Sequence, residues 1–330
     1  MTEAPGIPAW VSALAVERSA ARADKDFARS DLLRDEIASL GWVVKDTADG
    51  FALTQKPPYA VLANLAGVAQ SAVNLPEATC TVAVIVDGWP DDLETCMRAL
   101  LANIGDDIAV IGLDCGDVDG AGARLHEIST EFSGRVVEFH IDQPLARAGW
   151  AAAVCALVGV ATSEFFAVMD VSTILTGDAL TPILTTFEDP SVVASGWRGV
   201  NVNTEDGWRT FTDAGPGEVD AVLGYLMVVR TDAARECPPN SKATFYRNAD
   251  MEWSLSLREY GSTSGAGRIV VPAGELSLRQ DRHHAYHDTD PAYRDKESKK
   301  TYDRILQRFR GRAELLSPRE SSDFAPRLGL

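Results

Sequence analysis

The sequence predicts an α/β fold, Rossmann-like, with a mostly parallel sheet and helices on both faces, preceded by a small helical module. Three observations predict it. From residue 79 onward, apolar runs rich in β-branched residues alternate with helical patterns, as in parallel sheets. The first 57 residues instead show two helical patterns and a hairpin signal. With 330 residues, 45% of them hydrophobic, the chain is long enough for both units.

Residues 1–57 are predicted to form an α-hairpin followed by a β-hairpin. The helices are expected at about residues 8–23 and 27–40, and Gly41 favours helix termination. On the second helix, the apolar residues at helical spacing are Phe27, Leu33, Ile37 and Leu40. The dipeptide Asp49-Gly50 then predicts a tight turn between two short strands.

A linker is predicted over residues 58–78, and the α/β domain over residues 79–315. Its strands are expected at residues 81–86, 108–113, 136–139, 165–169 and 192–195. Helices are expected between them, at about residues 92–101, 122–132, 151–160 and 179–187. In such sheets, ligands bind beyond the carboxyl ends of the strands. Asp87, Asp114 and Asp170 each follow a predicted strand and are therefore candidate site residues.

The uneven distribution of charge restricts the possible partners. Residues 58–275 carry a net charge of −18, whereas residues 1–57 carry −2 and residues 276–330 carry +3. A field of this sign repels a nucleic-acid backbone, so DNA is not expected as a partner and RNA is disfavoured. The same field opposes a nucleoside diphosphate, whose binding would require a cation or the basic C-terminal segment.

The sequence predicts a cytoplasmic protein. It shows no stretch long and apolar enough to span a bilayer, no signal peptide, and five scattered cysteines without CxxC spacing. A basic amphipathic helix is expected at residues 302–309, with Ile305, Leu306 and Phe309 on one side. This side could contact an anionic membrane surface or pack on the core, and both alternatives stay open. Residues 316–330 are predicted to be a loose tail.

Two aspartates have both a catalytic and a purely structural interpretation. Asp170 ends a buried apolar strand, where its carboxylate could hold a divalent ion against a diphosphate or cap a turn. Asp250 begins a predicted helix. It could act as a general base on an acceptor hydroxyl, or it could be a negative charge favoured by the helix dipole.

A third candidate is the dense run of basic side chains at residues 279–287. Three of the five histidines of the chain fall in this run, with Arg279 and Arg282. His283 or His284 could complete a metal shell, preferentially for Mn²⁺, and the two arginines suit phosphate oxygens. The structural alternative is a polar surface loop.

Four segments within residues 79–310 together resemble a family 2 glycosyltransferase. They are residues 81–89, residues 168–173 with 175–180 after them, residues 224–230, and residues 248–258. The resemblance implies the GT-A fold and a nucleotide-sugar donor held with Mn²⁺ or Mg²⁺. It further implies inverting sugar transfer to a hydroxyl on a glycan, a lipid or a small molecule. A non-catalytic nucleotide-sugar-binding or scaffold protein on a degenerate GT-A fold is the alternative.

The same resemblance implies roles for individual residues. Asp170, with His284 or its neighbour His283, would bind the metal, and Asp250 would be the base. Asp87 and Asp114 would line the donor pocket, in addition to Arg279 and Arg282. The sequence departs from the family pattern at Ser172, which replaces the second carboxylate of the D-x-D segment, and at Asn248-Ala249, before the retained aspartate.

Residues 7–54 separately resemble the C-terminal module of cysteinyl-tRNA synthetase. The stretches that carry this resemblance are residues 17–31, 34–35, 40–41 and 46–50. The module is near neutral in charge, so we expect a docking or scaffold unit here, with RNA binding as the alternative.

Overall fold

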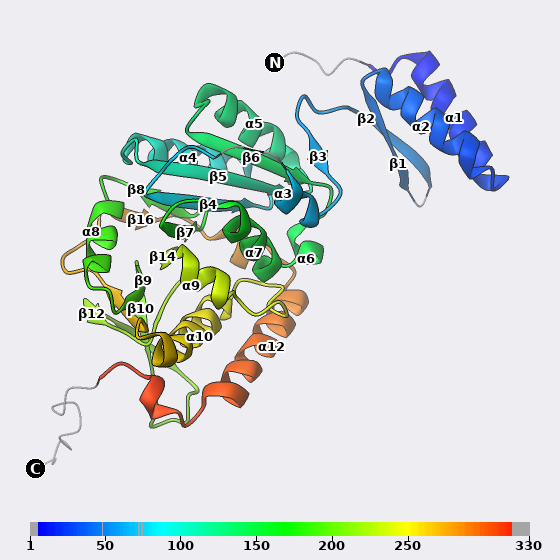
Figure 1. Ribbon diagram of the computed structural model, residues 1–330. Helices are drawn as coiled ribbons and strands as arrows, with labels where there is room; N and C mark the ends of the chain where they lie inside the picture. Colours follow the sequence, from blue (N-terminus) through cyan, green and yellow to red (C-terminus); the bar gives the residue numbers. More distant parts are fainter. Residues whose placement is uncertain (1–5, 48, 72, 74, 319–330) are drawn as a thin grey trace, which may run out of the picture. The chain divides into compact units, whose positions relative to one another are not determined.

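The computed structural model describes residues 6–47, 49–71, 73 and 75–318, and it separates into two compact units (Figure 1). The first unit is Met1–Ala60 and the second is Val61–Leu330. The first unit consists of α1 (Ala9–Ala23), α2 (Phe27–Ser39), β1 (Trp42–Thr47) and β2 (Gly50–Gln55). The two helices pack on each other and the two strands pair antiparallel, which confirms the predicted α-hairpin and β-hairpin.

A small apolar core holds the first unit together. It contains Val11, Ala15, Ile37, Trp42 and Val44. Leu33 and Ile37 are buried as their spacing predicts, but Phe27 and Leu40 are exposed, so the prediction of one apolar face was wrong at its two ends. The buried Arg18 side chain forms an ion pair of 2.6 Å with Asp46, which connects α1 to β1.

The second unit is built on a sheet with nine strands within the described residues. From one edge to the other these are β12 (Gly217–Glu218), β15 (Arg268–Val271), β9 (Val192–Gly196), β14 (Leu226–Arg230), β7 (Phe165–Met169), β4 (Cys80–Val86), β5 (Ile108–Cys115), β6 (Val136–Ile141) and β3 (Val61–Leu62). The pairs from β7 to β3 are parallel, as is β15 with β9. β14 runs antiparallel to both of its neighbours. The mostly parallel sheet is confirmed.

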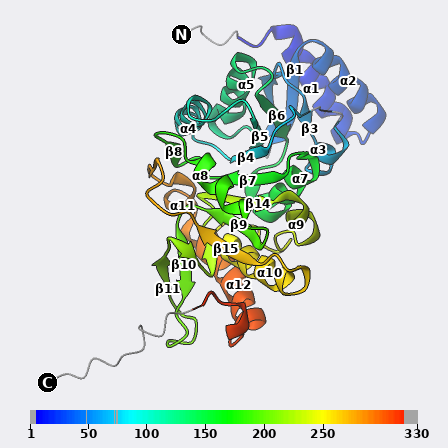
Figure 2. The same cartoon turned by 60° about the vertical axis from the view of Figure 1, so that its left-hand side comes forward.

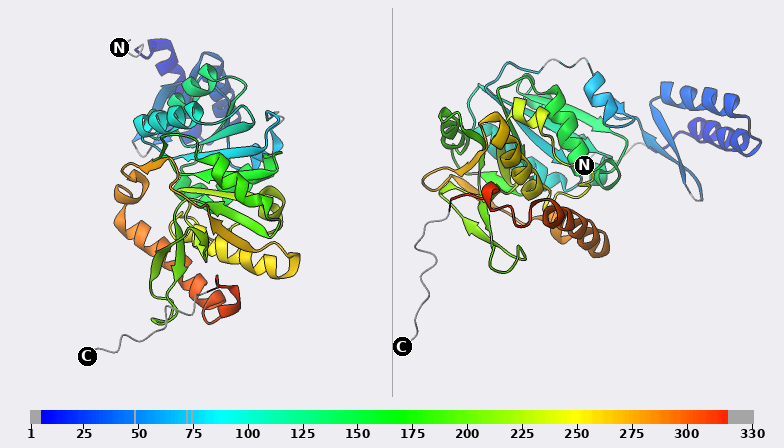
Figure 3. Two further views of the ribbon diagram at one scale, coloured as in Figure 1. Left: turned by 90° about the vertical axis from the view of Figure 1, so that its left-hand side faces the viewer. Right: turned by 60° about the horizontal axis from the view of Figure 1, so that its bottom comes forward.

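Helices cover both faces of this sheet (Figure 3). The helices of the second unit are α3 (Ala66–Gln70), α4 (Pro90–Ala102), α5 (Ala121–Glu131), α6 (Leu145–Ala148), α7 (Trp150–Val160), α8 (Leu180–Thr185), α9 (Thr231–Glu236), α10 (Ala249–Ser264), α11 (His284–His287) and α12 (Pro291–Phe309). One apolar cluster joins the sheet to α4, α5 and α8, and a second joins it to α3, α7, α9 and α10. Strand residues contribute alternately to the two clusters, because a strand buried on both faces places successive side chains on opposite sides.

The second unit also contains two smaller sheets. One consists of β10 (Gly199–Val202), β11 (Phe211–Ala214) and β13 (Ala221–Val222), and the other pairs β8 (Thr173–Leu175) with β16 (Leu278–Gln280). Figure 2 shows the ribbon of β10 and β11 near α12, where the Tyr302 hydroxyl donates a 2.6 Å hydrogen bond to the Trp208 carbonyl oxygen. The pairing of β16 with β8 carries the chain from β16 back toward Asp170, since the Asp281 N–H bonds to the Ser172 carbonyl oxygen.

Part of the segment predicted as a linker belongs to the second unit. Val61 and Leu62 pair with His140 and Ile141 of β6, and Val68 of α3 is fully buried against the sheet helices. The boundary between the compact units therefore lies at residue 60 and not at residue 57.

The C-terminal helix α12 uses its apolar side for packing. Ile305 and Phe309 are fully buried in a cluster with Leu255 of α10. These two side chains therefore pack on the core and do not contact a membrane. The chain after α12 stays attached at its described end, because Ser317 donates hydrogen bonds from its N–H and hydroxyl to Asp220. The predicted loose tail is therefore wrong for residues 316–318, and its residues 319–330 lie outside the described part.

Candidate functional site

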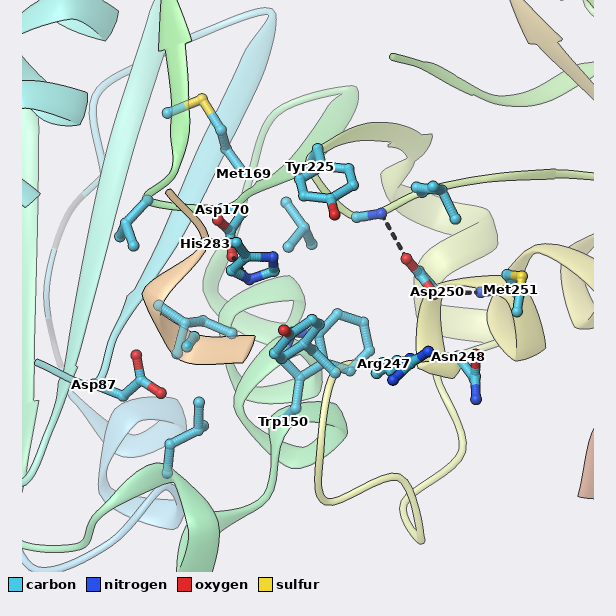
Figure 4. A pocket seen from close by; sticks show the side chains of 18 of the residues that line it. Asp87, Trp150, Met169, Asp170, Tyr225, Arg247, Asn248, Asp250, Met251 and His283 are labelled. Atoms are coloured by element: carbon cyan, nitrogen blue, oxygen red, sulfur yellow. Dashed lines mark hydrogen bonds and ion pairs between the residues drawn. The ribbon is translucent and has the colours of Figure 1, made fainter. Parts of the chain in front are cut away.

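A pocket opens where the predicted carboxylates meet at one edge of the central sheet. β4 and β7 are parallel, so Asp87 and Asp170, which follow them, lie at the same edge. β14 runs in the opposite direction, and this brings Tyr225, which precedes it, to that edge as well. The pocket has a volume of about 290 Å³, and Asp250 and His283 also line it (Figure 4).

The carboxylate of Asp170 has one oxygen fixed by the protein and one facing the pocket. Oδ1 accepts hydrogen bonds from the N–H and hydroxyl of Ser172, at 2.8 and 2.5 Å. Burial alone would raise the pKa of Asp170, but His283 and Ser172 outweigh it and hold this pKa below its ordinary value. Ser172, which departs from the D-x-D pattern, therefore orients the first carboxylate and, after His283, contributes to the lowered pKa of Asp170.

His283 faces the other oxygen of this carboxylate. Its Nε2 atom lies 3.1 Å from Asp170 Oδ2, and the side chain is 7% exposed. Nε2 is nevertheless buried without a hydrogen-bond partner among the described residues, because the contact lacks hydrogen-bond geometry. Figure 4 shows the two side chains facing each other at the pocket wall. An imidazole nitrogen and a carboxylate oxygen are both ligand types that divalent transition metals accept.

Asp250 stands on the other side of the pocket, in the first turn of α10. Its Oδ2 accepts a hydrogen bond of 2.8 Å from Gly224 N–H, and its Oδ1 accepts one from Met251 N–H. Burial, which these backbone bonds only partly offset, raises the pKa of Asp250 to about 6. Asn248, just before the helix, has φ of 67°, and this turn of the backbone begins α10 at the pocket. A carboxyl with this pKa can take a proton near neutral pH.

Asp87 is the third carboxylate of the pocket. Desolvation, together with the nearby charge of Asp170, raises the pKa of Asp87 to about 7. The pocket thus concentrates negative charge, and a bound cation would relieve this repulsion.

The structure does not bring the other predicted residues to this pocket. Asp114 is buried and bonded to His140 and to the backbone N–H of Asp117, with 3.1 and 3.0 Å between the bonded atoms. Arg279 is exposed and forms an ion pair with Asp281. Arg282 lines a neighbouring cavity and pairs with Asp288 at 2.7 Å.

His284 turns away from Asp170. Its Nε2 lies 3.3 Å from Asp92, its Nδ1 lies 2.5 Å from Asp288, and its ring stacks on Trp89. Of the two histidines proposed for the metal shell, the geometry therefore supports His283 and does not support His284. Within the described residues, no group of three or more His, Cys, Asp or Glu side chains converges as a complete metal shell.

Several pocket residues carry no role in the sequence interpretation. Trp150 opens α7 and lines the pocket, and Tyr225, Tyr246 and Arg247 border it. Arg247 and Tyr246 stand only three and four residues before Asp250, a proximity that could have indicated them. Trp150 has no comparable signal, because only the tertiary fold brings α7 to the pocket.

The described residues include no helix long and apolar enough to cross a membrane.

The first unit matches a known domain family. Residues 4–51 match the family model described as the cysteinyl-tRNA ligase anticodon binding domain. The cysteine–tRNA ligase of Opitutus terrae is 53% identical over 47 residues, which make up 14% of this chain and 10% of the ligase. The chain thus spans about a tenth of the length of the curated relatives that it matches. The predicted N-terminal resemblance is confirmed.

Two solved structures are similar to the chain at low sequence identity. The mannosyltransferase PcManGT from Pyrobaculum calidifontis, solved with GDP-Man and Mn²⁺, has a TM-score of 0.49 at 15% identity, covering 76% of this chain and 68% of that one. GalNAc-T7, solved with UDP, GalNAc and Mn²⁺, has a TM-score of 0.55 at 11% identity, covering 69% and 48%. The second likeness shows that the chain contains the GT-A glycosyltransferase fold.

Proposed function

We propose that the protein is a glycosyltransferase that moves a sugar from a nucleoside-diphosphate donor to a hydroxyl acceptor, with inversion and with a divalent cation. The observation that carries this proposal is the arrangement of one pocket, with Asp170 and His283 converging on one wall and Asp250 on the other. The GT-A fold supports it, and so does the presence of a nucleotide and Mn²⁺ in the GalNAc-T7 structure.

The residues present fit a cation at Asp170. Asp170 Oδ2 and His283 Nε2 lie 3.1 Å apart, close enough to hold one ion together, and diphosphate and water oxygens would complete the shell. When bound, Mn²⁺ or Mg²⁺ supplies positive charge that stabilises the departing diphosphate. Asp87 and Asp114 would lie on the nucleotide side, and Arg279 and Arg282 could reach the diphosphate only by exchanging their present carboxylate partners.

Asp250 would serve as the base of the reaction. Its carboxylate removes the proton from the acceptor hydroxyl as that oxygen forms a bond to the anomeric carbon and the bond to the diphosphate oxygen breaks. Attack from the side opposite the leaving group inverts the configuration at that carbon. The backbone donors Gly224 and Met251 keep the carboxylate oriented during this step.

The N-terminal unit would act as a docking or scaffold module of the enzyme. It matches about 50 residues of cysteine–tRNA ligases and not the remaining nine-tenths of those proteins. We place the protein in the cytoplasm, with a glycan, lipid or small molecule as acceptor.

The test is turnover of UDP-, GDP- and TDP-sugars with Mn²⁺ by the full chain, read as release of nucleoside diphosphate. We expect Asp250→Asn to lower turnover by about 10² or more while donor binding persists, because only the proton transfer is removed. Asp178→Asn is the matched control, since Asp178 is exposed and, among the described residues, its side chain bonds only to Thr181 N–H at the start of α8. Donor binding without turnover, unaltered in Asp250→Asn, would identify a non-catalytic nucleotide-sugar binder instead.

A further inference from the structure

A second cavity adjoins the pocket of Asp170. It has a volume of about 590 Å³ and shares four lining residues with that pocket, namely Tyr225, Tyr246, Arg247 and His283. A ligand in this cavity can therefore extend to the proposed reaction centre.

The lining of this cavity is cationic, although the chain as a whole carries a net charge of −17. Three guanidinium groups come from three separate segments: Arg198 from the turn between β9 and β10, Arg247 from the approach to α10, and Arg282 from the loop after β16. Within the part of the chain that the structure describes, Asp281 is the single carboxylate among the lining residues, and it pairs with Arg279.

Arg198 is held in place without a carboxylate. Its guanidinium carbon lies 4.5 Å from the ring centre of Trp197 and 5.0 Å from that of Tyr225. The residue has φ of 60°, a left-handed conformation that costs a non-glycine residue about 1 kcal/mol or more. No ion pair to Arg198 occurs among residues 6–47, 49–71, 73 and 75–318. A strained backbone thus presents an uncompensated cation to the cavity.

Arg247 is similarly uncompensated. It donates a 2.5 Å hydrogen bond to the Tyr286 hydroxyl and lies 4.8 Å from the centre of that ring. Arg294 lies on the same ring at 4.6 Å but pairs with Asp295, whereas Arg247 pairs with no carboxylate in the described segments. The two guanidinium groups without a carboxylate partner among the described residues, those of Arg198 and Arg247, therefore border one cavity.

Arg198 follows β9, and the place of β9 in the central sheet separates Arg198 from the nucleotide side of the site. Along the edge, the strand order β9-β14-β7-β4 places the end of β9 two strands from Asp170 and three strands from Asp87. At about 4.8 Å between strands, these separations are about 10 and 14 Å. Arg198 thus lies beyond Asp170 and Tyr225, away from Asp87.

We propose that this cavity binds a phosphate group carried by the acceptor, an assignment that rests on the proposed transferase function. A phosphate monoester carries a charge of about −1.5 to −2 and three acceptor oxygens. It can therefore engage guanidinium groups from three directions, whereas a carboxylate offers two oxygens in one plane. Its charge also matches the excess of cations that Arg198 and Arg247 leave in the cavity.

The experiment is calorimetric titration of the full chain with glycerol 3-phosphate, and with glycerate and glycerol as carboxylate and neutral matches. We expect glycerol 3-phosphate to bind at least about tenfold more tightly than glycerate, and glycerol not to bind. Arg198→Gln should weaken glycerol 3-phosphate at least about tenfold. Arg310→Gln, which removes the same charge from an exposed position that lines neither cavity, should leave it unchanged.

A parallel titration with UDP and Mn²⁺ separates this site from the donor site. We expect Arg198→Gln to change UDP affinity less than twofold. Equal losses for UDP and glycerol 3-phosphate would assign the cavity to the donor diphosphate and overturn the proposal, as would the absence of glycerol 3-phosphate binding. A third outcome is that no nucleotide binds although glycerol 3-phosphate still binds in an Arg198-dependent way. This result would contradict the transferase function and the assignment of the phosphate to an acceptor, and the cavity would be an anion site only.

A further experiment with lipid vesicles identifies whether the phosphate that binds in this cavity belongs to a lipid or to a soluble molecule. Sedimentation of the full chain with phosphatidylcholine vesicles containing phosphatidic acid, lost in Arg198→Gln and kept in Arg310→Gln, would support the site and assign a lipid-borne phosphate. Binding of glycerol 3-phosphate without such sedimentation would support it with a soluble acceptor.

Discussion

Two adjacent histidines have different partners because a short helix begins between them. His283 precedes α11 and faces Asp170, whereas His284 is the first residue of α11 and faces Asp92 and Asp288. The sequence predicts that a histidine of this run would bind the proposed metal, but it does not show which one. The choice depends on the phase of a four-residue helix, and a helix this short leaves no periodic pattern to read.

The pH dependence of turnover tests the role of Asp250. A base works when deprotonated, so with the pKa of Asp250 raised to about 6, activity should be full above pH 7 and fall as the pH drops through 6. Below that point the rate should decrease about tenfold per pH unit. The measurement is kcat against pH at saturating donor and Mn²⁺.

The control for this profile is the residual activity of Asp250→Asn, which should lack the acidic limb. Asp178→Asn should keep it. An acidic limb that persists in Asp250→Asn would assign the titrating group to another residue.

At the scale of elements, the sequence predicts the parallel core of the sheet well and its far side poorly. β4 and β7 are continuous apolar runs followed directly by Asp87 and Asp170, and β5 is apolar up to Asp114 near its end, so all three aspartates are visible in the sequence. Whether β14 is parallel or antiparallel depends on pairing with two strands distant in sequence, and no local pattern encodes that direction. Tyr225 reaches the pocket because of that direction, so its role could not be predicted from periodicity.

Two glycines in helices give opposite predictions for the same substitution. A Cβ added at Gly261 of α10 would overlap the backbone of Gly267 and come within 2.6 Å of the Ala266 carbonyl oxygen. Neither neighbour is a flexible side-chain end, so Gly261→Ala should destabilise the protein by about 1–3 kcal/mol. Gly159 of α7 has open space around its Cβ position, and Gly159→Ala should stabilise by about 0.5–1 kcal/mol.

Urea unfolding of the two variants checks this contrast. A midpoint lowered in Gly261→Ala and raised in Gly159→Ala is the expected result. Equal stability of Gly261→Ala and the parent chain would mean that α10 does not pack on the 266–267 loop as described.

For the whole molecule, the division into two units was predictable but its boundary was not. The change from helical patterns to alternating strands marks the division near residue 57. The two-residue strand β3 is too short to show a period, and its partner β6 lies about 80 residues further along the chain. The sequence pattern alone therefore predicts a linker where β3 and α3 lie.

Two truncated chains test this boundary. A chain that begins at Val61 should unfold cooperatively, because it keeps all contacts of the second unit. A chain that begins at Thr79 loses β3 and α3, including the fully buried Val68, and exposes the surface of α7 that they cover. Burial of one such side chain contributes about 1.5–3 kcal/mol, so the shorter chain should melt several degrees lower. Equal Tm values would restore the linker interpretation.

The central claim is that a cation held by Asp170 and His283 allows an acidic pocket to bind a nucleotide-sugar donor. Thermal unfolding of the full chain with UDP-, GDP- and TDP-sugars, with and without Mn²⁺, tests it most directly. A donor near 100 times its Kd should stabilise the fold by about 2.7 kcal/mol, only with Mn²⁺. This stabilisation should be absent in Asp170→Asn and kept in His284→Ala. A Tm that no donor changes, or a full Mn²⁺-dependent shift in Asp170→Asn, would contradict the claim.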